Sequence, residues 1–323
     1  MKYQKLGQSD LKVSSLCFGT MTFADGADKK ESAALYQACR DAGINFFDCA
    51  NVYAGGESEK YLGDFVKEHR SEVVLTSKAY FPTGAGADDK GTSKVSLFKA
   101  INQSLARLKT DYIDLYFLHR FDENTPLIET LEALDDLVKQ GKVRYTGVSN
   151  FAAWQIAKSL GLSALNDWAS FQCIQPMYNL VKRQVEVEIL PLAMSENIGV
   201  MPYSPLGGGL LSGKYGRHNK SENIGRLNQK EMYIKRYGAE WMYEVALHFC
   251  DLAQELKVNP VSLAISWVMA NPAVSSTIIG ARRVDQLLPA LKSCELKISD
   301  SLYQKISALS PAPAPATDRN DEL

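Results

Sequence analysis

Several features that would identify a common class of protein are missing from this chain. Its six cysteines are widely scattered and no two are spaced as CxxC, which argues against a zinc site and against a disulfide framework. No run of about 18 apolar residues occurs, and Met1–Lys5 opens into mixed polar sequence, so we expect neither a membrane span nor a signal peptide. The sequence therefore predicts a cytoplasmic protein with reduced thiols.

An excess of charge of one sign is also missing. The chain has 36 Lys and Arg against 37 Asp and Glu, without a basic block, so we expect no nucleic-acid partner and no membrane insertion. The dinucleotide fingerprint GxGxxG is missing too, because Gly207-Gly208-Gly209 does not complete it. Small-molecule chemistry is the class that remains, and no pattern indicates an oligomeric state.

Short apolar runs alternate with segments of helical spacing almost to the end of the chain. A short hairpin at 3–13 comes first, and the candidate strands that follow are 16–19, 46–49, 73–78, 113–119, 145–149, 171–175, 199–203 and 277–280. Helical spacing is found at 30–42, 58–68, 93–108, 127–139, 152–160, 190–197, 241–256, 261–270 and 284–291. We expect Gly43, Gly141 and Gly199 to end helices in the left-handed conformation.

Eight such units without a break in composition favour one α/β domain, a (β/α)8 barrel over residues 1–310. A doubly wound sheet is the second possibility. The long Gly-rich stretch 204–240 after the seventh strand predicts a functional or a disordered loop. The Pro- and Ala-rich residues 311–323 predict a flexible tail.

Four ionisable side chains close or directly follow three successive strands of this prediction. They are Asp48, Tyr53, Lys78 and His119. In a (β/α)8 barrel the chemistry lies at the carboxyl ends of the strands, so these groups are expected to meet. An ammonium beside a phenol lowers the phenol's pKa from its ordinary value of about 10. Lys78, held by Asp48, is therefore expected to make Tyr53 a proton donor while His119 polarises a carbonyl.

Each of these residues also has an ordinary structural interpretation. Tyr53 fits a packed aromatic with a satisfied hydroxyl, Asp48 a helix cap, Lys78 a solvated rim residue and His119 a core histidine. Only their joint placement at successive strand ends favours a site over these alternatives.

Further segments carry a resemblance that covers about residues 5–310. They are Asp48–Tyr53, Gly55–Glu59 with Leu62-Gly63, Thr76–Lys78, Arg107–Tyr116, Gly147–Phe151, Gln175–Asn179, Tyr203–Leu206 and Ile279–Arg282. With these segments in this order, the chain resembles the aldo-keto reductases. Arg120-Phe121-Asp122 after His119 is similar to the bacterial-type and potassium-channel-β-like branches.

The resemblance implies a (β/α)8 barrel that binds NADP(H) across its mouth without a Rossmann fingerprint. No metal is expected, since the scattered cysteines argue against a site. It implies that Tyr53 is the proton donor, Lys78 and Asp48 its tuning pair, and His119 the residue that orients a small-molecule carbonyl substrate. Around the nicotinamide it implies hydrogen bonds from Ser149, Asn150 and Gln175, stacking by Tyr203, and ribose contacts from Gly19, Thr20 and Met21.

The remaining cofactor contacts are expected at the two loops after the last strands. Backbone amides of Ser204, Leu206, Gly208 and Leu210 suit a pyrophosphate. At the adenosine end the resemblance implies Gly280, Arg282 and Gln286, with Arg282 on the 2′-phosphate, although an ordinary surface arginine is the alternative. Ala290 departs from the family's frequent asparagine and leaves Gln286 as the adenine neighbour.

Two functions from different classes follow. The first is an NADPH-dependent reductase of aldehydes or ketones. The second is a cofactor-binding regulatory module that resembles potassium-channel β subunits and acts through a partner with little turnover. The sequence does not name the substrate.

Overall fold

The computed structural model describes residues 1–215, 227 and 231–317. At its centre lies a parallel sheet of eight strands in the order β10-β3-β4-β5-β6-β7-β8-β9. The bounds are β3 (Leu16–Gly19), β4 (Phe46–Asp48), β5 (Val74–Ala79), β6 (Ile113–Leu118), β7 (Val143–Ser149), β8 (Phe171–Gln175), β9 (Gly199–Val200) and β10 (Thr277–Ile279).

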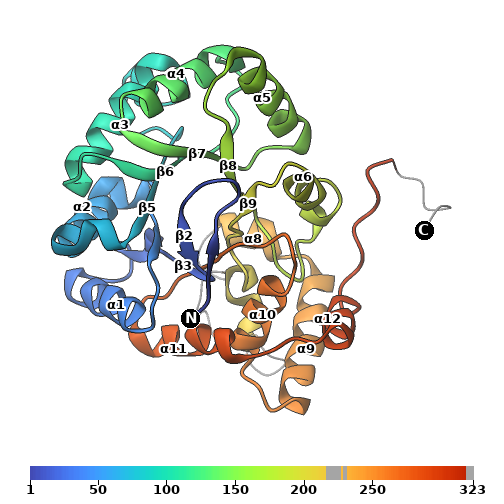
Figure 1. Cartoon of the computed structure of the whole chain (residues 1–323). Helices are drawn as coiled ribbons and strands as arrows, with labels where there is room; N and C mark the ends of the chain where they lie inside the picture. Colours follow the sequence, from blue (N-terminus) through green and yellow to red (C-terminus); the bar gives the residue numbers. More distant parts are fainter. Residues whose placement is uncertain (216–226, 228–230, 318–323) are drawn as a thin grey trace.

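The two outer strands of this sheet meet and close it into a barrel. Val200 forms a parallel bridge with Val274, and the Ile278 amide donates to the Pro202 carbonyl at 2.9 Å. Helices surround the ring of strands (Figure 1). The predicted single-domain (β/α)8 barrel is therefore confirmed, and the doubly wound sheet is excluded.

The helices begin where the sequence supplies capping groups. Asp28 accepts a hydrogen bond from the Glu31 amide at 2.8 Å, and Asn259 caps a helix whose first residue is Pro260. The helices are α1 (Lys29–Asp41), α2 (Glu57–Val66), α3 (Lys94–Leu108), α4 (Leu127–Lys139), α5 (Ala153–Asn166), α6 (Ile189–Ser195), α8 (Glu231–Tyr237), α9 (Glu240–Glu255), α10 (Pro260–Met269), α11 (Val284–Leu291) and α12 (Asp300–Ser307).

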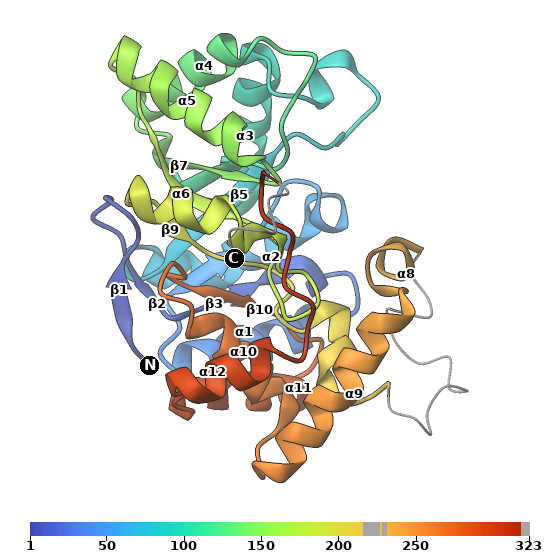
Figure 2. The ribbon, with the colours of Figure 1, turned by 90° about the vertical axis from the view of Figure 1, so that its right-hand side faces the viewer.

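The N-terminal hairpin closes one end of the barrel. Its strands are β1 (Tyr3–Lys5) and β2 (Lys12–Ser14), and Leu6 and Leu11 between them pack with the interior side chains of the barrel. The hairpin and α8 lie at opposite ends of the barrel (Figure 2). The carboxyl ends of the strands face away from the hairpin, so that end is left for a site.

Two of the three predicted left-handed glycines are confirmed. Gly43 has φ 83° and Gly141 has φ 71°. The prediction for Gly199 is wrong, since Gly199 lies in β9 and Asn197 takes the left-handed conformation with φ 52°. Glycine is needed at 199 for another reason, because a Cβ there would lie 2.6 Å from Leu6 Cδ1.

The stretch 204–240 differs from the predicted loop. It contains the 3₁₀ segment η6 (Gly207–Ser212) and helix α8, while residues 216–226 and 228–230 of the predicted loop lie outside the described residues. Helix α12 was not predicted either. It is held by Tyr303, which stacks on Trp267 with ring centroids 5.6 Å apart.

Residues 311–317 form neither helix nor strand, and the flexibility expected for 311–323 stays a prediction. All six cysteines lie in the described residues and are free thiols. Within the described ranges no helix has the length and apolar character needed to cross a membrane. Over the same residues, no cluster of His, Cys, Asp and Glu side chains is suited to hold a metal ion.

Candidate active site

Three strands and the turn after β4 bring the predicted ionisable residues together at the open end of the barrel. Asp48 is the last residue of β4, Lys78 lies near the end of β5, and His119 follows β6. Tyr53 begins the short segment η2 (Tyr53–Gly56) that leads from β4 into α2. The parallel register aligns β4 with β5 and β5 with β6, so the three strand ends lie side by side.

Lys78 is the centre of this cluster and is fully buried. Its Nζ donates to both carboxylate oxygens of Asp48, at 2.7 and 2.6 Å, and to the Cys49 carbonyl at 2.8 Å. Burial opposes the ammonium form, but the charges of Asp48 and Tyr53 overcome it and raise the pKa of Lys78. Lys78 is therefore a fixed positive charge inside the barrel.

Tyr53 approaches this charge with its hydroxyl. The distance from Lys78 Nζ to the Tyr53 oxygen is 3.4 Å, and the ammonium lies 5.1 Å from the centroid of the ring. Lys78 lowers the pKa of Tyr53 as the sequence predicts, but burial has the larger effect and raises that pKa to about 12. The phenol is thus protonated at neutral pH, with a cation in place to stabilise the phenolate.

His119 completes the group from the neighbouring strand. Its ring meets the Tyr53 ring edge to face with centroids 6.1 Å apart, and it meets the Phe81 ring in the same manner at 4.9 Å. Burial and the Lys78 charge hold the pKa of His119 well below its ordinary value of 6.5, so the imidazole is neutral. Its Nδ1 is buried without a hydrogen-bond partner among the described residues. A neutral imidazole beside a phenol is suited to orient a polar substrate oxygen.

The residues predicted to hold a carboxamide form one hydrogen-bonded chain on the other side of Asp48. Gln175 Nε2 donates to Asp48 Oδ1 at 2.8 Å, and the Ser149 hydroxyl donates to the Gln175 carbonyl at 2.8 Å. Asn150 donates to the His119 carbonyl at 2.9 Å and accepts from the Tyr203 hydroxyl at 2.7 Å. Polar groups from β7, β8 and the loop after β9 are thereby joined to the ionisable cluster.

The three residues at and just after the end of β3 lie on the flank of Asp48 opposite β5. Gly19 ends β3, and Thr20 and Met21 begin the 3₁₀ segment η1 (Thr20–Thr22). The buried Thr20 hydroxyl donates to the Asp48 carbonyl at 3.1 Å and accepts from Ser58 at 2.9 Å. The Thr20 side chain therefore holds the turn in place through bonds within the protein.

The residues predicted to face a pyrophosphate lie on a tightly turned segment after β9. Ser204 has φ 58°, Leu206 precedes η6, and Gly208 with φ 68° and Leu210 lie within η6. Glycine is required at 208 because a Cβ would also lie 2.6 Å from the Tyr233 ring. Successive turns of this kind present backbone amides to one side, which is the geometry that anions prefer.

The residues predicted for the adenosine end of the cofactor lie between β10 and α11 and within α11. Gly280 follows β10, and the Arg282 amide donates to Gln286 Oε1 at 3.1 Å at the start of α11. The Arg282 side chain packs over Gly26, and its guanidinium has no hydrogen bond or ion pair within the described part of the chain. This free guanidinium is the group that suits a phosphate.

Sequence reasoning missed two contributors to the cluster. Thr76, which is fully buried, donates from Oγ1 to Asp48 Oδ1 at 2.7 Å, and Phe81 packs on His119. Thr76 was detectable, because residues two apart on a strand share a face and Thr76 precedes Lys78 by two. Phe81 was not, since its position depends on the path of the loop after β5.

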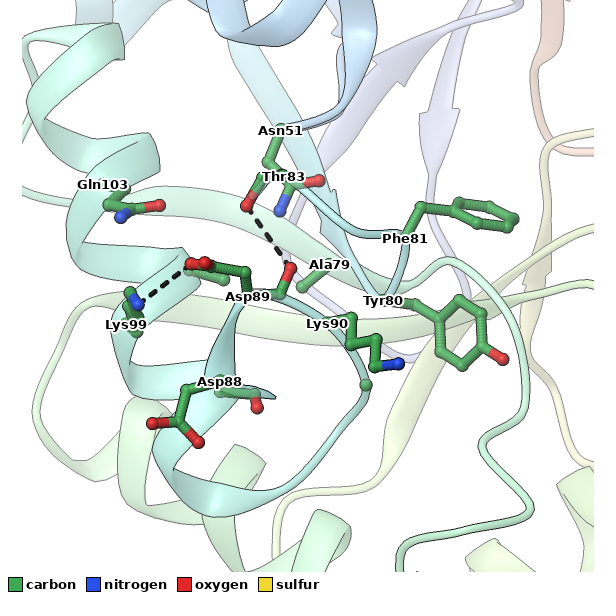
Figure 3. Close-up of a pocket in the computed structure, with 13 residues that line it drawn as sticks. Asn51, Ala79, Tyr80, Phe81, Thr83, Asp88, Asp89, Lys90, Lys99 and Gln103 are labelled. Carbon is green, nitrogen blue, oxygen red and sulfur yellow. Dashed lines mark hydrogen bonds and ion pairs between the residues drawn. The ribbon is translucent and has the colours of Figure 1, made fainter. Parts of the chain in front are cut away.

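A small hollow lies beside this cluster, under the loop after β5. Asn51, Thr83, Asp89, Lys99 and Gln103 are among the residues that line it (Figure 3). Its volume is about 10 Å³, which is the space of a single water molecule. Asn51 Oδ1 is buried without a hydrogen-bond partner among the described residues. The hollow is too small for a substrate, so it belongs to the packing of the loop.

Known proteins are similar to this chain over almost its whole length. The model of the family described as "Aldo/keto reductase family" matches residues 15–311. A rice protein (Oryza sativa subsp. japonica) named "Probable voltage-gated potassium channel subunit beta" is 36% identical, over 96% of each chain.

Two bacterial relatives cover the chain to the same extent. A Bacillus subtilis (strain 168) protein named "Uncharacterized oxidoreductase YrpG" is 34% identical, over 98% of each chain. "Protein tas" of Escherichia coli (strain K12) is 30% identical, over 96% of this chain and 97% of the relative. The similarity thus extends over the whole barrel.

Proposed function

The chain belongs to the aldo/keto reductase family, whose members are oxidoreductases that generally use nicotinamide cofactors, and we propose that it reduces an aldehyde or ketone to the alcohol with NADPH. The observation that carries the proposal is the buried Lys78 ammonium, bound by Asp48 and 3.4 Å from the Tyr53 hydroxyl, with neutral His119 alongside. This arrangement suits proton donation to a developing alkoxide.

The residues at the barrel mouth fit such a cofactor. Ser149, Asn150 and Gln175 supply amide and hydroxyl groups beside Asp48, where a carboxamide would be held, and Tyr203 would lie against the ring. The free guanidinium of Arg282 matches a 2′-phosphate. When bound, the nicotinamide supplies the hydride that the carbonyl carbon accepts.

Residues of the chain itself orient the substrate and donate the proton. Neutral His119 donates a hydrogen bond to the substrate oxygen and fixes the carbonyl toward Tyr53. As negative charge develops on that oxygen, the Tyr53 proton moves to it and completes the alcohol, and Lys78 stabilises the phenolate that remains. Asp48 keeps Lys78 charged and in place, and the phenolate regains its proton from water.

The decisive experiment removes the Tyr53 hydroxyl. Tyr53→Phe is expected to lower kcat for aldehyde reduction by about 10² to 10⁴, the usual contribution of a general acid. The affinity for NADPH, measured by fluorescence titration, is expected to stay unchanged, since the proposed cofactor contacts remain.

Tyr145→Phe is the matched control, because its hydroxyl bonds to Asp10 at the hairpin end of the barrel. It is expected to keep wild-type kcat. A Tyr53→Phe enzyme with half the wild-type kcat would refute the assignment.

A second function has support from the names of the relatives. The rice protein named as a potassium channel subunit beta is 36% identical, and an Arabidopsis thaliana protein of the same name is 37% identical. On this alternative the chain binds a nicotinamide cofactor and acts through a partner. Tight NADPH binding without oxidation across a broad panel of aldehydes and ketones would favour the regulatory module, and steady turnover would favour the reductase.

A further inference from the structure

A buried carboxylate that the proposed mechanism does not use is hydrogen-bonded to Ser77, the residue next to Lys78. Glu59, in the first turn of α2, is fully buried. Its Oε1 accepts a hydrogen bond from the Ser77 hydroxyl at 2.5 Å, and its Oε2 accepts from Arg107 Nε at 2.6 Å. Burying a charge costs free energy unless the charge is paired and hydrogen-bonded. The positions of Glu59, Ser77 and Arg107 are therefore fixed relative to one another.

The partners of Glu59 connect it to the strand that carries Lys78. Ser77 and Lys78 are neighbours on β5, and successive side chains of a strand point to opposite faces. Lys78 therefore faces the barrel interior and Ser77 faces the helix layer, where Glu59 meets it. A shift of Glu59 would therefore displace Ser77, and with it the backbone of the adjacent Lys78.

The other side of Glu59 is connected to Tyr53 through a turn with an unusual backbone. Ala54, Gly55 and Gly56 all have positive φ, at 48°, 64° and 95°. A backbone in this strained conformation is stable only where the surrounding structure fixes it. Arg107 supports it from below, because a Cβ at Gly56 would lie 2.8 Å from Arg107 Cδ.

We propose that Glu59 is a positioning residue that fixes the Tyr53 hydroxyl against the Lys78 ammonium, by tying the turn after Tyr53 to β5 through Ser77 and to α3 through Arg107. The inference rests on the proposed reductase function for its catalytic consequence. The 3.4 Å contact between Lys78 and Tyr53 is longer than the 2.6 and 2.7 Å contacts between Lys78 and Asp48, so it depends most on where the turn lies.

The test replaces Glu59 with the isosteric Gln and compares it with Asp64→Asn. Asp64 lies on the same helix and also pairs with cations, Lys29 at 2.6 Å and Lys109, but at the surface. Glu59→Gln is expected to lower kcat by as much as about 10²-fold, the usual effect of a small misplacement of reacting groups, with unchanged affinity for NADPH. Asp64→Asn is expected to keep wild-type values.

The pH profile separates positioning from mere loss of stability. Lys78 lowers the pKa of Tyr53, so a looser pair is expected to move the kinetic pKa of the acid upward in Glu59→Gln. Ser77→Ala removes one bond to Glu59 and leaves the Arg107 pair intact, so it decides the question where Glu59→Gln does not fold. A smaller fall in kcat in the same direction is expected for it.

A measurement without turnover keeps the inference independent of the proposed function. Hydrogen–deuterium exchange is expected to rise in peptides covering residues 50–56 in Glu59→Gln and Ser77→Ala, and to stay at the wild-type level in β8. An inactive wild-type protein would refute the reductase function, while the exchange data would still decide the role of Glu59. If Glu59→Gln and Ser77→Ala both kept wild-type kcat, pH profile and hydrogen exchange, the positioning role of Glu59 would be overturned.

Discussion

Arg282 is the residue on which the choice between NADPH and NADH depends in the proposed function. Its guanidinium has no hydrogen bond or ion pair within the described ranges, and a charge-assisted contact with a phosphate contributes about 1.5 to 3 kcal/mol. Arg282→Ala is therefore expected to weaken NADPH binding by about one to two decades and to leave NADH binding almost unchanged. Fluorescence titration with both nucleotides measures the two affinities.

The adjacent arginine provides the matched control for this comparison. Arg283 is exposed and pairs with Asp285 at 2.9 Å, so Arg283→Ala is expected to leave both affinities unchanged. Equal losses for NADPH and NADH in Arg282→Ala would mean that the substitution loosens the last strand, and would remove Arg282 from the phosphate site.

His119 makes stability depend on pH. Its pKa lies well below 6.5 in the folded chain, because burial and the Lys78 charge disfavour the imidazolium. Below the unfolded pKa the unfolded chain binds a proton that the folded chain does not. The stability that neutral His119 contributes is therefore fully present above about pH 6.5. It is lost as the pH falls toward the pKa of His119 in the folded chain.

Urea unfolding at about pH 7.5 and at about pH 5 measures this effect. The free energy of unfolding is expected to fall more between these pH values in the wild type than in His119→Asn, which lacks the titrating ring. The difference between the two proteins isolates His119 from the carboxylates that titrate in both. Parallel falls would contradict a neutral, buried imidazole.

For single residues, the sequence predicted which side chains lie close together better than it predicted the environment of each side chain. Strand ends predicted that Asp48, Lys78 and His119 converge, because the edge of a parallel sheet is set by local patterns. The balance of forces on Tyr53 was not predictable, since the burial that raises its pKa to about 12 depends on the surrounding fold. Glu59 stood in the predicted helix without a sign that it is buried.

The hairpin is the element whose contribution can be tested separately from the chemistry. A Cβ at Gly199 would lie 2.6 Å from Leu6 Cδ1 and 3.0 Å from the Gly7 amide nitrogen. Gly199→Ala is expected to destabilise the protein by about 1 to 3 kcal/mol through overpacking. The kcat of the folded enzyme is expected to stay unchanged, because the hairpin closes the end of the barrel opposite the site.

Gly161→Ala is the control for Gly199→Ala. Gly161 lies within α5 with no atom inside 4 Å of a new Cβ, so alanine there is expected to stabilise the helix by up to about 1 kcal/mol. Thermal and urea unfolding measure both variants. Wild-type stability in Gly199→Ala would mean that the hairpin does not pack tightly against β9.

Elements whose own residues carry a clear apolar pattern were predictable, and two helices held mainly by tertiary contacts were not. The predicted bounds of β3, β8, α4 and α11 agree with the structure. Helices α8 and α12 are short, and short helices depend on tertiary contacts more than on their own sequence. The packing of Tyr233 against the turn at Gly208 is such a contact, and no local pattern contains it.

For the whole molecule, the alternation of strands and helices was sufficient to predict the barrel, because parallel strands joined by helices have few stable arrangements. Closure of the barrel was not visible in any single segment. It depends on the Val200–Val274 bridge and on hydrogen bonds between residues near β9 and β10. The spacing of apolar residues along the chain does not predict these contacts.

The pairing of β3 with β10 has a consequence for the synthesis of the protein. Leu16 lies opposite Thr277, so one edge of the first barrel strand has no partner until nearly the whole chain has left the ribosome. Parallel pairing between distant segments forms slowly, and an open strand edge attracts other strands. The nascent chain therefore carries an open strand edge through most of its translation, and the barrel cannot close before β10 has been synthesised.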